Sequence, residues 1–442
     1  AYCLLPTAYC LLPTAYCLLP VARCLLPSYK TPMSNSLTLA SLADGTILSP
    51  FSRLRQLLDG TPPGHEKPID LTLGEPCETM PPFVATKIAE AEALFAKYPP
   101  IRGSDELRQA IAAWIGRRYG LAGAGAIDPA REVLPCNGSR EGLFYAAFPA
   151  VGRKQRQGLA ARPAILMCNP FYQAYLGGAL AAGAEPVFLN ATADTSHLPD
   201  LDALEADTAL LARTAALYLC SPANPQGAVA DAAYIARALA LARAHDVMLF
   251  LDECYSEIYG GAPPVGGLEV ASKTPERFRN LVVFNSLSKR SNLPGLRSGF
   301  SAGDGDFLDT LFEVRNLIGP QMPGPTQHAS AAVWAEEQHV TANRLAYARK
   351  YDVADAVLGT RFGYRRPAGG FFLWLDMSGL GNGENAALTL WKRFGVKVIP
   401  GAYLARAGRD ETNPGAPYVR VALVHDAATI REALERFVHV SA

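Results

Sequence analysis

The sequence has no excess of charge of either sign and no long apolar run. Among its 442 residues, Lys and Arg total 41 and Asp and Glu also total 41, so the formal net charge is zero. Because nucleic acids and anionic membranes attract basic surfaces, this balance gives no reason to expect either as a partner. No apolar stretch approaches the length that a membrane-spanning helix requires. We therefore predict neither a nucleic-acid partner nor a membrane partner.

Paired cysteines are also lacking. The nine cysteines include no Cys-x-x-Cys pair and no Cys/His cluster, so the sequence predicts no zinc site or other metal site. Five cysteines stand among mostly apolar neighbours: Cys77, Cys136, Cys168, Cys220 and Cys254. Such positions favour small core residues in a reducing compartment, and we predict a cytoplasmic protein.

Residues 1–28 are four copies of a heptapeptide, each containing Cys-Leu-Leu-Pro, and the fourth copy has Arg23 in place of Tyr. A proline in every copy excludes a continuous helix, and no basic segment precedes a compact apolar one, as in a signal peptide. We expect residues 1–32 to form an extended or disordered tail, and Met33 would make an ordinary start. The alternative is an apolar arm that packs on a partner.

From residue 160 onward, short apolar runs alternate with helical patterns. Strands are predicted at Ala164–Met167, Pro186–Leu189, Ala216–Leu219, Met248–Leu251, Leu281–Phe284 and Gly299–Ala302. This alternation predicts a three-layer α/β/α fold with a mostly parallel sheet covered on both faces.

After Pro320 the pattern changes to an α+β segment, with a long helical stretch at Gln327–Leu358 and strands at Gly370–Asp376, Val396–Ile399 and Tyr418–Val424. We predict a large domain over residues 81–322 and a small domain over 323–442. Residues 33–80 are predicted to form an arm and part of the small domain.

Polar residues follow three of the predicted buried strands. Asn224, Asp252 and Lys289 come after Ala216–Leu219, Met248–Leu251 and Leu281–Phe284, respectively. Ligands of parallel sheets bind at the carboxyl ends of strands. A buried Asp252 needs a cationic partner, which a protonated pyridine nitrogen would provide. The alternatives are a helix cap for Asp252 and a turn-forming residue for Asn224.

The stretch around Lys289 has the pattern S-x-S-K-x(7)-R-x-G. A lysine at a buried strand end loses solvation, so its amine is more easily neutral and nucleophilic. Ser286, Ser288 and Arg297 are suited to holding a phosphate beside it. Together they indicate a lysine that forms a Schiff base with pyridoxal phosphate. A surface Lys/Arg loop is the alternative.

Further candidates surround this stretch. Tyr172 is suited to stacking on the ring, with core packing as its alternative, and Tyr255 is suited to reaching the ring hydroxyl. Arg420 is a charge inside an apolar strand, so it either faces a cleft and grips a carboxylate or points to solvent. Gly74 allows close approach of a ligand, or it belongs to a plain turn. The Gly138–Ser139 turn, which opens a helix, suits an anion.

These motifs resemble the fold-type-I, class I/II aminotransferases that use pyridoxal 5'-phosphate, from about residue 45 to the C-terminus. The resemblance implies an aspartate-aminotransferase-like fold, with Lys289 as the Schiff-base lysine and Asp252 as the partner of the pyridine nitrogen. It places Asn224 and Tyr255 at the ring hydroxyl. The other implied roles are a phosphate cradle (Ser139, Arg140, Ser286, Ser288, Arg297), a stacking aromatic (Tyr172), a tyrosine that reaches the other subunit's phosphate (Tyr98), the α-carboxylate arginine (Arg420) and a backbone contact to substrate (Gly74).

Two runs, Leu73–Cys77 and Lys289–Gly299, together with Tyr98-Pro99-Pro100, are also similar to bacterial succinyldiaminopimelate aminotransferases of lysine biosynthesis. This similarity implies a homodimer that catalyses ping-pong transamination between glutamate/2-oxoglutarate and N-succinyl-diaminopimelate with its oxo partner. For the second carboxylate of such substrates, Arg102 is our first candidate and Arg290 our second. The alternative for Arg102 is a surface ion pair.

Three other functions stay open: a C–S lyase of the same fold, an aminotransferase of different specificity, and a non-catalytic sensor of the cofactor. The sensor is disfavoured because residues 1–28 are neither basic nor helix-turn-helix-like.

Overall fold

The computed structural model describes residues 37–441 except 46 and 159–160. The predicted tail, with its repeat, lies outside the described residues. In the described part, no helix combines the length and apolar character needed to cross a membrane.

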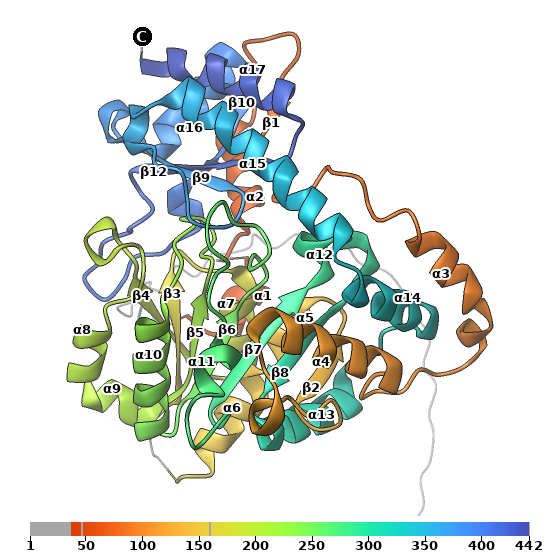
Figure 1. Cartoon of the computed structure of the whole chain (residues 1–442). Helices are drawn as coiled ribbons and strands as arrows, with labels where there is room; N and C mark the ends of the chain where they lie inside the picture. Colours follow the sequence, from red (N-terminus) through yellow and green to blue (C-terminus); the bar gives the residue numbers. More distant parts are fainter. Residues whose placement is uncertain (1–36, 46, 159–160, 442) are drawn as a thin grey trace, which may run out of the picture. The chain divides into compact units, whose positions relative to one another are not determined.

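A seven-stranded sheet forms the larger part of the fold (Figure 1). Its strands, in spatial order, are β2 (Val133–Cys136), β8 (Gly299–Gly303), β7 (Leu281–Ser286), β6 (Met248–Asp252), β5 (Thr214–Cys220), β3 (Ala164–Asn169) and β4 (Glu185–Asn190). The β3, β4, β5, β6 and β7 strands pair in parallel, whereas β8 runs antiparallel to both of its neighbours. The predicted mostly parallel sheet is therefore confirmed.

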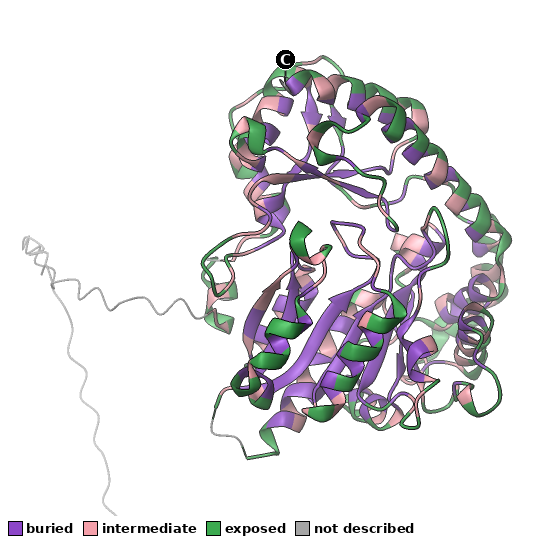
Figure 2. Cartoon of the chain, turned by 60° about the vertical axis from the view of Figure 1, so that its left-hand side comes forward, coloured by how far each residue is buried: buried purple, intermediate pink, exposed green. Residues whose placement is uncertain are grey.

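Side-chain alternation along the strands divides the core of this part into two apolar layers. Leu249, Leu251 and Val283 pack on one face of the sheet, and Phe250 and Phe284 pack on the other. Helices whose apolar residues join the first layer are α4 (Asp105–Tyr119), α10 (Ala232–Ala244), α11 (Gly267–Ala271) and α14 (Gly324–Ala335). Those joining the second are α5 (Ser139–Tyr145), α6 (Ala147–Gln155), α7 (Gln173–Ala181) and α13 (Gly305–Ile318). Figure 2 shows the buried strands between these helices.

Helix α4 begins directly after Ser104. The Ser104 hydroxyl accepts a hydrogen bond from the Leu107 N–H at 3.2 Å, which satisfies one of the free donors at the start of α4. Gly120 ends the helix with φ of +66°, a conformation that glycine adopts without strain.

The smaller part has two sheets. Strands β11 (Ile399–Pro400), β12 (Tyr418–Ala422) and β9 (Phe372–Asp376) form an antiparallel sheet, and β1 (Ile69–Asp70) pairs in parallel with β10 (Val396–Lys397). The main helices here are α2 (Pro50–Leu58), α15 (Gln338–Leu358), α16 (Gly383–Phe394) and α17 (Ala427–Val438). The β1–β10 pair joins a strand of the N-terminal segment to one of the C-terminal segment. The remaining helices are short: α1 (Leu39–Ala43), α3 (Val84–Glu90), α8 (Leu201–Ala206), α9 (Thr208–Arg213) and α12 (Leu287–Arg290).

Two local predictions differ from the structure. The stretch Gln327–Leu358 is two helices rather than one, because the Glu336 carboxylate accepts the N–H groups of Gln338 and His339 and starts α15 there. The predicted strand Val396–Ile399 is split between β10 and β11, which pair in different sheets.

Strand β2 was not predicted at all. It is four residues long and contains Pro135, which weakens the strand pattern in the sequence. It lies at the edge of the sheet and pairs only with β8, a position where proline is tolerated because one side needs no ladder bonds.

Candidate active site

Three of the predicted site residues, Asn224, Asp252 and Lys289, lie at the carboxyl ends of the central parallel strands. In the register of β5, β6 and β7, Cys220 lies beside Asp252, and Asp252 lies beside Phe284. Asn224 follows β5, Asp252 ends β6, and Lys289 lies in α12, directly after β7. The parallel pairing of these strands therefore brings together residues that are 28 to 65 positions apart in the chain.

Asp252 is a buried carboxylate without a cation. It accepts hydrogen bonds from the Tyr175 hydroxyl at 2.7 Å and the Cys254 N–H at 3.2 Å, and burial raises its pKa. The next helix, α11, begins only at Gly267, so Asp252 does not cap a helix. Within the described residues it has no positively charged partner, which is the environment that a protonated ring nitrogen would complete.

Lys289 has the environment predicted for a nucleophilic amine. Its Nζ donates a hydrogen bond to the Gly74 carbonyl oxygen and lies 5.3 Å from the centre of the Phe371 ring. Burial lowers the pKa of Lys289 to about 8. About one tenth of the amine is therefore neutral at pH 7, far more than for a lysine with the usual pKa, and the neutral amine is the form that a nucleophile or a proton acceptor requires.

Hydroxyl groups and a guanidinium line the next part of the site. The Ser286 and Ser288 hydroxyls lie 2.8 Å apart, and Arg297 donates to the Asn137 carbonyl oxygen at 3.0 Å. A Cβ atom on Gly138, whose φ is +77°, would lie 2.3 Å from the Arg297 guanidinium. Glycine is therefore needed there for Arg297 to lie against the turn that carries Ser139.

Arg140 and Tyr172 contact each other. Arg140 donates to the Tyr172 hydroxyl at 2.6 Å, and its guanidinium lies 5.3 Å from the centre of the ring. Ser139 accepts a contact from the Cys254 thiol at 2.9 Å, two residues after Asp252. These contacts connect the start of α5 with the start of α7 and with the end of β6.

Arg420 is a buried guanidinium without an acidic partner in the described part of the chain. It donates to the Asn224 side-chain oxygen at 3.1 Å and to the Thr72 carbonyl oxygen at 2.7 Å, while its Nε has no partner there. Its guanidinium lies 4.3 Å from the centre of the Phe372 ring, and burial lowers its pKa to about 10. The solvent-facing alternative is wrong, because Arg420 is only 5% exposed. Such a charge is suited to binding a carboxylate.

Tyr255 and Gly74 lie close to these groups. The Tyr255 ring packs edge-on against Phe371 and Phe372, at 5.3 and 5.8 Å between ring centres. Burial raises the Tyr255 pKa, and the nearby Arg420 opposes that rise. A Cβ atom on Gly74 would lie 2.6 Å from the Phe372 ring, so a side chain there would clash.

Neither arginine suggested for a second carboxylate is free in the structure. Arg102 pairs with Asp309 at 2.7 Å, which is the ion pair given above as the alternative. Arg290 is fully buried between Trp114 and Trp334, and it pairs with Glu337 at 2.6 Å. For Arg102 the structure thus shows the ion pair that was the alternative, and for both arginines another carboxylate already neutralises the charge.

Tyr98 lies apart from the residues above. It is 99% exposed and makes no hydrogen bond or ring contact with the described part of the chain. Its predicted contact with another subunit stays a prediction.

Sequence reasoning missed Tyr175, the hydrogen-bond donor to Asp252. Tyr175 is buried, and its ring stacks on Tyr218 at 4.6 Å between ring centres. The available signal was its position three residues after Tyr172, at the start of a helix that follows a buried strand. Core packing explains a tyrosine there equally well, so the signal was weak.

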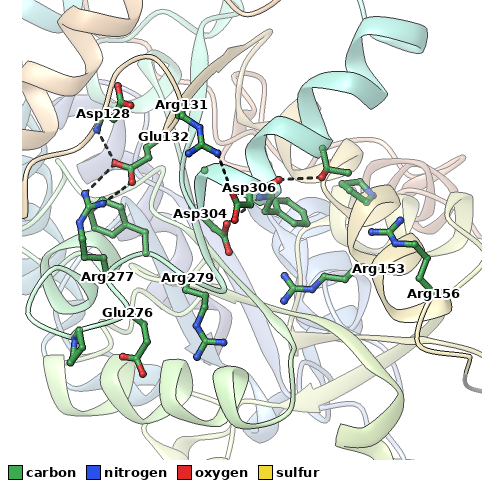
Figure 3. Close-up of a pocket in the computed structure, with 16 residues that line it drawn as sticks. Asp128, Arg131, Glu132, Arg153, Arg156, Glu276, Arg277, Arg279, Asp304 and Asp306 are labelled. Carbon is green, nitrogen blue, oxygen red and sulfur yellow. Dashed lines mark hydrogen bonds and ion pairs between the residues drawn. The ribbon is translucent and has the colours of Figure 1, made fainter.

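A large cavity lies at the amino ends of the parallel strands, at the opposite side of the sheet from the residues described above (Figure 3). It has a volume of about 600 Å³ and is lined by five arginines and five acidic residues, together with uncharged ones. Arg277 pairs with Glu132 at 2.9 Å, and Arg131 pairs with Asp306 at 2.8 Å. The charges of this cavity balance one another, and none of the predicted site residues lines it.

Comparison with known proteins identifies the family. The family model "Aminotransferase class I and II" matches residues 66–437. The chain belongs to this family. This aminotransferase is a pyridoxal 5'-phosphate-dependent enzyme that catalyses transamination, with the aspartate-aminotransferase-like fold.

Relatives and solved structures agree with this identification. An LL-diaminopimelate aminotransferase of Syntrophobacter fumaroxidans is 30% identical over 374 residues, which cover 83% of this chain and 90% of the relative. The structure of an aminotransferase from Neisseria meningitidis has a TM-score of 0.83 and 36% identity, covering 89% of this chain and 98% of that one. The N-succinyldiaminopimelate aminotransferase of Mycobacterium tuberculosis has a TM-score of 0.75 and 25% identity, covering 90% and 98%.

Three features of the site fit this cofactor. Asp252 lacks the cation that a pyridinium would supply, Lys289 has a lowered pKa, and Gly138 leaves room for Arg297 beside the serine hydroxyls. All three lie at the strand ends where ligands of such sheets bind.

Proposed function

We propose that this aminotransferase exchanges an amino group between glutamate/2-oxoglutarate and N-succinyl-diaminopimelate with its oxo partner, in lysine biosynthesis. The observation that carries the amino-acid part is Arg420, a buried guanidinium held by Asn224 and Thr72 with no acid among the described residues. The succinylated substrate is supported by the similarity to a structure bearing that name and to a diaminopimelate aminotransferase.

The proposed cofactor site uses the residues described above. Asp252 would hold the ring nitrogen, Asn224 and Tyr255 the ring hydroxyl, and Tyr172 the face of the ring. The phosphate would be held by Ser139, Arg140, Ser286, Ser288 and Arg297. When bound, the cofactor supplies an electron sink for the electron pair left at the substrate Cα.

Lys289 is the proposed general base and acid. Its Nζ accepts the proton from the substrate Cα and later returns a proton, and its lowered pKa suits both steps. Arg420 binds the α-carboxylate through charge-assisted hydrogen bonds, while the Gly74 carbonyl oxygen and Phe371 keep Lys289 in place. In this way the Cα–H bond is presented to the amine.

The proposed assembly is a homodimer in which Tyr98 reaches the phosphate in the other subunit. Tyr98 stands in a segment with other exposed apolar side chains, including Phe95 at 64% exposure. Leu317 and Ile318, at 85% and 55% exposure, add to the exposed apolar surface. Such surface marks interaction sites in folded proteins.

For the domains, we propose a large domain and a small domain that also contains part of the N-terminal segment. We propose that the boundary lies at Glu336, between α14 and α15, rather than at residue 322. Val333 and Trp334, in α14, belong to the same apolar layer as the large sheet. The cytoplasmic location stays a prediction from cysteine usage.

A substrate screen tests the proposed function. The purified enzyme, loaded with pyridoxal phosphate, is assayed with N-succinyl-diaminopimelate or LL-diaminopimelate as donor and 2-oxoglutarate as acceptor, and glutamate formation is measured. We expect the succinylated donor to give the higher kcat/KM. Preference for neutral aliphatic or aromatic donors would overturn the proposal, and pyruvate release without an acceptor would indicate a C–S lyase.

A further inference from the structure

The segment Leu404–Arg406 lies along the carboxyl end of β3. The Phe171 N–H donates to the Leu404 carbonyl oxygen at 3.0 Å. The buried amide of Asn169, the last residue of β3, donates to the Arg406 carbonyl oxygen at 2.8 Å and accepts from the Arg406 N–H at 3.1 Å. In Figure 1 this dark-blue loop runs beside β3 and β4. The main chain of Arg406 is thus bonded to Asn169, which lies three residues before Tyr172, the proposed stacking aromatic.

The Arg406 guanidinium has no partner among the described residues. The side chain is half-buried, and burial lowers its pKa. The charge that acts on it is that of Arg53, another cation, which lowers the pKa further. Arg53 itself has an acidic neighbour, since it lies 3.9 Å from the Glu384 carboxylate. A partly desolvated guanidinium without an anion costs free energy.

Two neighbouring charged residues in the same loop, Arg409 and Asp410, have partners. Arg409 pairs with Asp207 at 2.5 Å, and the Asp410 carboxylate accepts the Thr412 hydroxyl at 2.7 Å. The Arg409–Asp207 pair joins this end of the loop to the residue that precedes α9. Arg409 is exposed and paired, so it stabilises the loop, whereas Arg406 is half-buried and has no acidic partner among the described residues, so it is suited to binding a ligand.

We propose that Arg406 binds the distal carboxylate of the substrate while Arg420 binds its α-carboxylate. Arg406 is fixed at the end of β3, and Arg420 is fixed to Asn224, just after β5. These two strands are neighbours in the sheet, and neighbouring strands lie about 4.8 Å apart. Two cations over adjacent strands match a substrate with a carboxylate at each end. The inference rests on the proposed function and names the side chain that selects dicarboxylic substrates.

Three variants of the loaded enzyme test this proposal: Arg406→Gln, Arg406→Lys and Arg409→Gln. The main-chain contacts of Arg406 with Asn169 remain in all of them, so the loop stays in place. Steady-state kinetics are measured with glutamate and with alanine as donors, and inhibition is measured with glutarate and with butanoate. Glutarate has two carboxylates and butanoate has one. The ratio of their inhibition constants therefore reports the contact of the second carboxylate, without any turnover of the inhibitor.

In Arg406→Gln we expect kcat/KM for glutamate to fall about tenfold to a hundredfold, the usual effect of losing one charge-assisted contact. The loss should be mainly in KM, with alanine little affected and glutarate inhibition weakened more than butanoate inhibition. Arg406→Lys should recover part of the loss, and Arg409→Gln should match the wild type.

Equal losses for glutamate and alanine, or an unchanged glutarate-to-butanoate ratio in Arg406→Gln, would overturn the assignment of Arg406. If the wild type itself shows no preference for glutamate over alanine, the proposed function fails instead. The two failures are distinguishable because the second appears before any substitution is made. If Arg406→Gln is poorly folded, the same comparison is made with Arg406→Lys, in which the ratio must shift toward butanoate.

Discussion

Both ends of the parallel strands of the large sheet carry charged residues, but in the described part of the chain ion pairs are common at the amino ends, which we call the amino edge, and lacking for the central groups at the carboxyl ends, the carboxyl edge. At the amino edge, three of the five arginines that line the cavity in Figure 3 are paired with acids: Arg131, Arg153 and Arg277. At the carboxyl edge, Asp252, Lys289 and Arg420 are buried or half-buried, and none has an ion pair within the described residues. Paired charges stabilise the fold modestly, whereas unpaired buried charges reduce stability and are retained where a ligand completes them.

The pKa values express the same contrast. Burial lowers the pKa of Lys289 to about 8 and that of Arg420 to about 10, and it raises the pKa of Asp252. At the amino edge, pairing with Arg153 and hydrogen bonding hold the pKa of the Asp246 carboxyl below its usual value, despite the opposing effect of burial. Strongly shifted groups without partners cluster at functional sites.

The largest expected effect follows replacement of the lysine at the carboxyl edge. Lys289→Ala should reduce kcat by at least about 10²–10⁴-fold, because the proton-transfer group is lost. The variant should still bind pyridoxal phosphate, but without a covalent bond. Activity assays and borohydride trapping with peptide mapping check this. Lys273→Ala, which removes an exposed lysine paired with Glu269, is the control. Near wild-type turnover in Lys289→Ala, or trapping on another lysine, would contradict it.

Next in size is the effect of removing the unpaired guanidinium. Arg420→Gln should raise KM and lower kcat/KM for every amino donor, because all donors share the α-carboxylate. The loss of kcat/KM should correspond to about 1.5–3 kcal/mol of lost transition-state stabilisation. The matched control is Arg277→Gln at the amino edge, which should leave both constants unchanged. A loss restricted to dicarboxylic donors would show that Arg420 does not bind the α-carboxylate.

A smaller, graded effect is expected from pH. In the cofactor-free enzyme, only the neutral amine of Lys289 is nucleophilic, and its pKa lies near 8. The rate of covalent capture of pyridoxal phosphate should therefore rise about tenfold per pH unit below that value and level off above it. Stopped-flow absorbance between pH 6 and pH 10 measures this rate. A lysine with the unperturbed pKa of about 10.4 would give a rate that still rises at pH 10, without a plateau.

The smallest expected effect concerns the amino edge itself. Arg277→Ala removes the partner of Glu132 and a hydrogen bond to the Ala126 carbonyl oxygen. Since the side chain is about one-third exposed, we expect a loss of about 1 kcal/mol in the free energy of unfolding. Urea denaturation checks the stability, and turnover should be unchanged. Reduced turnover without reduced stability would show that this edge takes part in function.

Part of the fold was predictable because it depends on local pattern. The strands that end in Asp252 and Ser286 are continuous apolar runs, and the helix after Ser104 has its cap in the sequence. Strand β2 was not predictable, because it is short and interrupted by proline, and its pairing with β8 involves residues more than 160 positions away.

The sequence by itself determined the alternation of strands and helices, and with it which polar residues follow buried strands, because burial of a strand depends on its own side chains. Only the tertiary structure decided which charges stay unpaired. Arg102 and Arg290 looked available in the sequence, yet Asp309 and Glu337, which lie 207 and 47 positions away, neutralise them. Arg406 and Arg420 have no such acid among the described residues. Ion pairs form between residues that folding brings together, so the residues free to bind a substrate can be recognised only after the chain has folded.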